Sequence, residues 1–172
     1  MSRVVIYASA RVNGNTAKLL QHWQWYVAND PVIDLTQLQI LPFSYQSDSR
    51  ADDFEETIRA LLTYEQWLWV TPVYWYSMTS WHKLFLDRMS DLLTYHKPLG
   101  RQLRGKSLAV LTNSASESLP KCFSDIFELT ANYLGMAWLG AEHIPAIDDQ
   151  FEPEQLTQAI SRLHLKCSSH LP

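Results

Sequence analysis

Polar side chains gather in the segment Ser9–Thr16, which follows a dense apolar run near the start of the chain. The residues with binding chemistry in it are Ser9, Arg11, Asn13, Asn15 and Thr16. Apolar residues at helical spacing come next, so the segment leads into the N-terminus of a helix. Such an end presents unpaired N–H groups and partial positive charge, and a guanidinium adds a cation. The segment therefore predicts a phosphate site.

A second interpretation of this segment stays open. Asn15 or Thr16 would only cap the helix, and Arg11 would be a solvated surface charge. The segment matches neither G-x-x-x-x-G-K-[ST] nor G-x-G-x-x-G, which disfavours a P-loop nucleotidase and a standard dinucleotide-binding fold.

A second candidate site follows the apolar run Trp67–Val70, which suits a strand covered on both faces. We expect the strand to stop at Thr71-Pro72, and the loop residues of interest are Pro72, Val73, Tyr74, Trp75, Tyr76 and Ser77. Three consecutive aromatic residues on an exposed turn indicate that something flat, or another subunit, covers them. An isoalloxazine or nicotinamide ring fits that description. A core or dimer contact is the alternative, and both can hold.

A third polar segment, Thr112–Pro120, follows the next apolar run. Its residues Asn113, Ser114, Ala115 and Ser116 would supply polar contacts to the edge of a ring, although a plain solvent loop explains the segment equally well. The six histidines show no metal-binding spacing, so no metal site is predicted. Cys122 is expected to be a partly buried structural thiol.

Five apolar runs alternate with helical patterns along the chain. The expected strands are Val4–Ala8, Val32–Leu35, Trp67–Val70, Ser107–Leu111 and Met136–Ile144. The expected helices cover Thr16–Ala28, a segment from Phe54, a long segment from Met78 to Leu93, Phe123–Leu134 with Gly135 as C-cap, and a segment from Pro153, with a turn at Lys97–Gly100. Alternation predicts an α/β three-layer sandwich, a five-stranded parallel sheet in the flavodoxin-like order 2-1-3-4-5. The loops after the first and third strands then face one crevice.

Composition limits the function classes. A length of 172 residues suggests one domain, 1–172, and a net charge of -4 argues against a nucleic-acid partner. No charged leader precedes the first strand, and no apolar run approaches the ~18 residues of a membrane span, so the expected location is cytoplasmic. Seven tryptophans indicate a flat-ligand site or a subunit interface.

The motifs S-x-R-x-x-G-N-T, T-P-V-Y-W-Y-S-M and K-x-F-L-D-R resemble those of the flavodoxin-like NAD(P)H-dependent oxidoreductases, the FMN reductase and quinone reductase group. The resemblance implies that the first segment holds the FMN phosphate and that Pro72–Ser77 and Asn113–Ser116 contact the isoalloxazine. It also implies that Lys83, Phe85, Leu86, Asp87 and Arg88 anchor the aromatic loop and face a partner in a homodimer or tetramer. The third segment departs from the family in lacking glycine.

The implied reaction passes hydride from NAD(P)H through flavin N5 to a quinone, a nitro- or azo-aromatic compound, or free flavin, with no catalytic side chain required. Tyr74, Trp75 and Tyr76 would shape the acceptor pocket. Two alternatives share the fold: an electron-carrier flavodoxin, and a cofactor-free binding or regulatory module.

Overall fold

The sheet has the predicted order. The computed structural model describes residues 2–46, 51–148 and 150–170. Five parallel strands lie in the order β2-β1-β3-β4-β5, and their bounds are β1 Arg3–Tyr7, β2 Val32–Asp34, β3 Gln66–Pro72, β4 Ser107–Ser114 and β5 Ala137–Pro145. The order reverses between β1 and β3, so the loops after these strands meet at the switch point. The flavodoxin-like fold class is confirmed.

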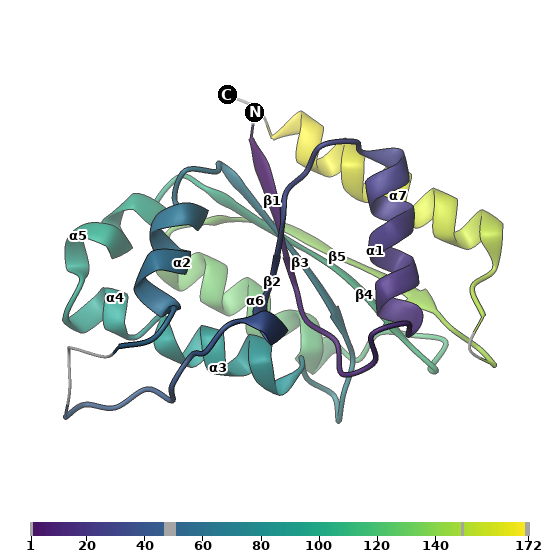
Figure 1. Cartoon of the computed structure of the whole chain (residues 1–172). Helices are drawn as coiled ribbons and strands as arrows, with labels where there is room; N and C mark the ends of the chain where they lie inside the picture. The colour runs from purple at the N-terminus through teal and green to yellow at the C-terminus, as the bar shows by residue number, and fades with distance from the viewer. Residues whose placement is uncertain (1, 47–50, 149, 171–172) are drawn as a thin grey trace.

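Helices cover both faces of the sheet (Figure 1). α1 (Asn15–Tyr26) and α7 (Pro153–Ser169) lie on one face, whereas α2 (Phe54–Leu61), α3 (Ser80–Arg88) and α6 (Lys121–Leu134) lie on the other. Each of the three central strands buries apolar side chains on both faces of the sheet. In β1, for example, Val5 packs in the layer of α1 and α7, and Val4 packs in the opposite layer. Two hydrophobic cores therefore fix the sheet, and with it the loops at the carboxyl ends of its strands.

The prediction of one continuous helix from Met78 to Leu93 is wrong. The helix begins later, after the N-cap Thr79, and breaks after Arg88 into α3 and the short α4 (Asp91–Thr94). The buried Arg88 guanidinium pairs with Asp52 and Asp91, and the N–H groups of Met89 and Ser90 bond three residues back. Such tightened turns keep the apolar residues in phase, which is why the sequence pattern passes unbroken through the kink.

Three other element assignments need correction. Lys97–Gly100 is one turn of helix, α5, with Pro98 at its start, rather than a turn, and short 3₁₀ turns cover Leu35–Gln37 and Arg101–Leu103. The described residues therefore hold seven α-helices instead of five. Strand β3 runs through Pro72, because β1 ends opposite Val70 and no strand lies beside the nitrogen of Pro72. Strand β4 continues to Ser114, so Asn113 and Ser114 belong to a strand and not to its exit loop.

The remaining boundaries agree closely with the sequence. Gly135 ends α6 with φ 75°, the left-handed conformation that glycine adopts freely, which confirms it as the C-cap. Pro153 opens α7 as expected.

Candidate functional site

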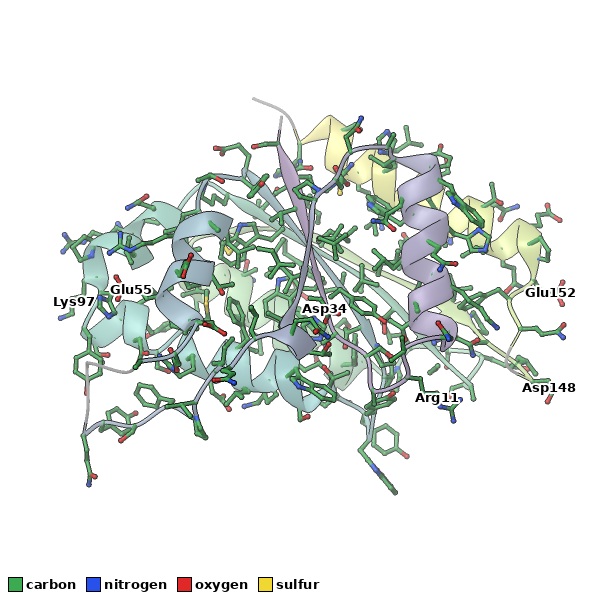
Figure 2. The ribbon with its side chains drawn as sticks, in the orientation of Figure 1. Arg11, Asp34, Glu55, Lys97, Asp148 and Glu152 are labelled. Carbon is green, nitrogen blue, oxygen red and sulfur yellow. The ribbon has the colours of Figure 1, made fainter. Side chains whose placement is uncertain are left out.

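One cavity of about 420 Å³ joins the three segments that the sequence singled out. Arg11 is one of its lining residues, and Figure 2 shows this residue at the lower edge of the molecule below α1. The cavity is lined by Ser9, Arg11, Gly14, Asn15, Thr16, Pro72, Val73, Tyr74, Asn113, Ser114, Ala115 and Ala146. Its volume lies in the ordinary range of small-molecule sites.

The first segment brings the N-terminus of α1 to this cavity. Gly14 is the N-cap, no side chain caps the helix, and its first turn contains no acidic residue. A Cβ on Gly14 would meet the Cβ of Arg11 at 2.8 Å, so the segment folds this tightly only with glycine there. The interpretation of Asn15 or Thr16 as a helix cap is therefore wrong. The N-terminus of α1, with Gly14 as its N-cap, therefore lies at this cavity without a capping side chain.

Thr16 instead ties the first segment to the third. Its hydroxyl donates a 2.9 Å hydrogen bond to Oδ1 of Asn113, and both side chains are buried. The N–H of Val73 donates to the Asn113 carbonyl at 3.0 Å, so one residue of β4 holds the first and second segments together.

The second segment is a two-residue hairpin turn. The N–H of Tyr74 donates to the Ser77 carbonyl at 2.8 Å, and the N–H of Ser77 donates back to the Tyr74 carbonyl at 3.0 Å. Its central residues Trp75 and Tyr76 have φ 49° and 65°, which such turns require and which bulky side chains rarely adopt. Each costs on the order of 1–3 kcal/mol, and strain of this kind persists at functional sites. Trp75 is 93% and Tyr76 66% exposed.

His82 on α3 links the end of β1 to the residue that precedes α3. Its Nε2 lies 3.1 Å from the Ile6 carbonyl, an acceptor only, so Nε2 carries the proton and donates. Nδ1 then accepts from the Thr79 hydroxyl at 3.0 Å. Complete burial lowers the His82 pKa to about 4, so the ring is neutral at physiological pH. The end of β1 and the start of α3 are thereby fixed to each other.

Five predicted site residues do not line the cavity: Asn13, Trp75, Tyr76, Ser77 and Ser116. Sequence reasoning missed Ala146, whose small apolar side chain gives no chemical signal, and His143, which it grouped with the other histidines. His143 Nε2 lies 2.8 Å from the Ser114 hydroxyl. The adjacent carboxylates Asp148 and Asp149, which the sequence places as a charge pair before the last helix, fall partly outside the described residues, which omit Asp149.

Two negative findings apply to residues 2–46, 51–148 and 150–170. No group of three or more histidine, cysteine, aspartate or glutamate residues there is arranged to hold a metal ion. No helix in the same part of the chain is long and apolar enough to cross a membrane.

The sequence of residues 1–144 matches the family model of the NADPH-dependent FMN reductases. The chain belongs to that family. It is therefore an NAD(P)H-dependent, FMN-containing reductase, which disfavours an electron carrier without a substrate and a cofactor-free module. Among curated proteins no sequence matches this reductase significantly.

Solved structures share the fold of the reductase at low identity. The Trp repressor binding protein of Bacillus subtilis superimposes with a TM-score of 0.70 at 22% identity, covering 96% of each chain. An NADPH-quinone reductase from P. pentosaceus gives 0.68 at 17% identity over 96% of this chain and 98% of that one. An FMN-dependent NADH-azoreductase from Bacillus anthracis, solved in complex with FMN, gives 0.66 at 11% identity over 99% and 100%.

Proposed function

We propose that the reductase binds FMN in the 420 Å³ cavity and passes hydride from NAD(P)H to a flat aromatic acceptor: a quinone, a nitro- or azo-aromatic compound, or free flavin. The observation that carries the proposal is that this cavity is lined by two chemically different sets of residues. Anion-binding groups lie at one end and an exposed aromatic turn lies beside the other. Bound FMN supplies the hydride chemistry at N5. A quinone reductase and an azoreductase share the fold, which supports these acceptor classes.

The residues present fit the phosphate of FMN. Ser9, Arg11, Asn15 and Thr16 all line the cavity where α1 begins. Ser9, Asn15 and Arg11 offer a hydroxyl, an amide and a guanidinium, and the helix end adds its N–H groups, with no carboxylate in the first helical turn to oppose an anion. The Thr16 hydroxyl already donates to Asn113 and has no proton left for the phosphate. Asn13 shares the segment without lining the cavity, so we assign it no direct contact.

The opposite end fits a flavin ring. Pro72, Val73 and Tyr74 of one segment and Asn113, Ser114 and Ala115 of another line this part of the cavity and would flank the ring. The N–H groups of Val73 and Tyr74 are bonded to the carbonyls of Asn113 and Ser77, which fixes the position of this segment. The role of this chain is to hold and orient the ring and to exclude water from it. Trp75 and Tyr76 stand outside the cavity, where they would contact the acceptor.

We also propose that residues 1–172 form one domain that pairs as a homodimer through α6. The expected partner-facing role of Phe85 and Arg88 on α3 is wrong, because both side chains are buried within the chain. Leu129 is 68% and Tyr133 77% exposed, and they share a face of α6 with Cys122, which is exposed rather than partly buried as expected. The Cys122 thiol lies 3.9 Å from the Tyr76 carbonyl, so this apolar stripe continues into the aromatic turn.

The distribution of charged residues along α6 supports a second copy of the chain as the partner that binds this apolar stripe. Along α6, Asp125 is paired with Lys121 at 2.8 Å and Glu128 lies at the middle of the helix, whereas Lys97, Arg101 and Arg104 line a pocket with Tyr133 near the C-terminal end. A two-fold axis that sets the two α6 helices antiparallel brings Glu128 of each chain toward the basic cluster of its partner.

An FMN titration tests the proposed site. Arg11→Ala should weaken FMN binding of flavin-free protein by at least about tenfold, since one charge-assisted contact is worth roughly 1.5–3 kcal/mol. Arg59→Ala is the matched control, because Arg59 is an exposed residue of α2 that pairs with Glu55 and does not line the cavity. Unchanged FMN affinity in Arg11→Ala, or equal weakening in both variants, would show that the phosphate binds elsewhere.

A further inference from the structure

A second cavity, of about 670 Å³, lies beside the flavin cavity between the end of β5 and α7. It is lined by Glu117, His143, Pro145, Ile147, Asp148, Gln150, Glu152, Gln155, Gln158 and Arg162. Figure 2 shows Asp148 and Glu152 on the loop that leads into α7, at the side of the molecule next to Arg11. Ser114 lines the flavin cavity and His143 lines this second one, and the two side chains contact each other at 2.8 Å. The pair therefore forms part of the wall between them.

The hydrogen bonds of Ser114 make the direction of its proton depend on His143. The N–H of Ser116 already donates to the Ser114 oxygen at 3.2 Å. When Nε2 of His143 carries no proton, the Ser114 hydroxyl donates to it. When Nε2 is protonated it donates to Ser114, and the hydroxyl proton of Ser114 is free to point into the flavin cavity.

Charged groups surround His143 on the side of the second cavity. Glu117 follows β4, Asp148 and Glu152 flank the β5–α7 loop, and Arg162 comes from α7. The adjacent Glu142 holds Arg162 at 3.1 Å and Lys166 at 2.7 Å. Burial lowers the pKa of His143, so the ring is mostly neutral at pH 7 and can take a proton from water in the second cavity.

We propose that His143 and Ser114 relay a proton from the second cavity to the acceptor bound over the flavin, an inference that rests on the proposed function. A quinone that receives hydride becomes a monoanion and needs one proton to become the hydroquinone. The Ser114 hydroxyl gives that proton, Nε2–H of His143 restores the hydroxyl, and water reprotonates His143. The sum is NAD(P)H, quinone and one proton giving NAD(P)⁺ and hydroquinone. His143 acts through Ser114 and is a positioning residue.

The test uses His143→Gln, whose amide can still bond Ser114 but does not titrate. Ser114→Ala is a smaller change, and it serves as the second test variant in case His143→Gln does not fold. The enzyme is bleached with NADPH without air, then mixed with a naphthoquinone between pH 5 and pH 8, in H₂O and D₂O. The wild-type acceptor rate should fall by about tenfold or more as pH rises, and should be slower in D₂O. Both variants should be at least about tenfold slower than wild type at low pH, with a flat profile and no isotope effect.

A readout independent of turnover accompanies these rates. In flavin-free protein the His143 ring proton is titrated by NMR, and its pKa should move in Ser114→Ala because the bonded hydroxyl is lost. The FMN dissociation constant of His143→Gln should stay within about twofold of wild type.

A variant profile that keeps the wild-type pH dependence overturns the relay. So does equal slowing of the NADPH and acceptor steps with weakened FMN binding, since a purely structural role would cause that. A wild type that takes up no FMN overturns the proposed function as well, whereas a wild type that NADPH reduces, but whose acceptor step ignores His143, overturns the relay alone.

Discussion

The Thr16 hydroxyl on α1 donates a hydrogen bond to the Asn113 side chain on β4, and this bond joins two segments that are 97 residues apart in the chain. Both partners are buried and line the 420 Å³ cavity in which we propose that FMN binds. The bond therefore links the stability of the fold to the shape of the site.

Thr16→Val should lower the free energy of unfolding by about 1–3 kcal/mol, because Oδ1 of Asn113 then loses its donor in a buried place. Chemical denaturation measures the change. Thr130→Val is the control, since the Thr130 hydroxyl donates to the Ile126 carbonyl within the same helix, α6. A loss in Thr130→Val as large as in Thr16→Val would contradict the importance of the link.

The strained aromatic turn should trade stability for acceptor binding. Trp75→Asn with Tyr76→Gly places residues that tolerate positive φ at both positions, and should raise the free energy of unfolding by about 1 kcal/mol or more. The same variant should raise the KM for a quinone several-fold while NADPH still bleaches the flavin at the wild-type rate. An unchanged KM would mean that the exposed rings do not contact the acceptor.

His82 should make the fold sensitive to acid. The unfolded chain binds a proton on this residue below pH 6.5 and the folded chain only below about 4, so its contribution is complete above pH 6.5 and is lost as pH falls toward 4. The two pKa values correspond to about 3 kcal/mol. Denaturation curves measured between pH 7 and pH 4 should therefore show that the free energy of unfolding falls more steeply with decreasing pH in wild type than in His82→Asn. Burial also lowers the pKa values of His143 and His164. Because both proteins keep these two histidines, the difference between the slopes of wild type and His82→Asn reports His82 alone. Equal slopes would exclude this role.

The proposed dimer should dissociate when charge enters the α6 stripe. Wild type should elute at twice the 19.9 kDa of the chain, and Leu129→Glu with Tyr133→Glu at the mass of one chain. Leu165→Glu on α7 changes a residue that is 63% exposed in the opposite layer and serves as the control. A wild-type protein that elutes at 19.9 kDa would contradict the dimer.

The sequence predicted the sheet order and the meeting of the segments after β1 and β3 at one cavity, for a physical reason. Runs such as Val4–Ala8 and Trp67–Val70 are apolar without alternation because they are buried on both faces, so they mark central parallel strands directly. The switch-point rule then brings the segments after β1 and β3 together without any knowledge of their side-chain contacts.

Contacts between distant residues were beyond the sequence. The kink after Arg88 depends on its pairing with Asp52, 36 residues earlier, and leaves the apolar periodicity unchanged. Thr16 looked like a helix cap because its partner Asn113 belongs to another strand. His143 carried no signal, since only the fold places it against Ser114.

The most direct test of the central claim is the visible spectrum of the purified reductase, reconstituted with FMN, before and after NADPH is added without air. The account predicts two flavin bands that bleach promptly with NADPH and return when a quinone is added. Flavin bands that persist in NADPH, or a protein that stays colourless after FMN is offered, would contradict it.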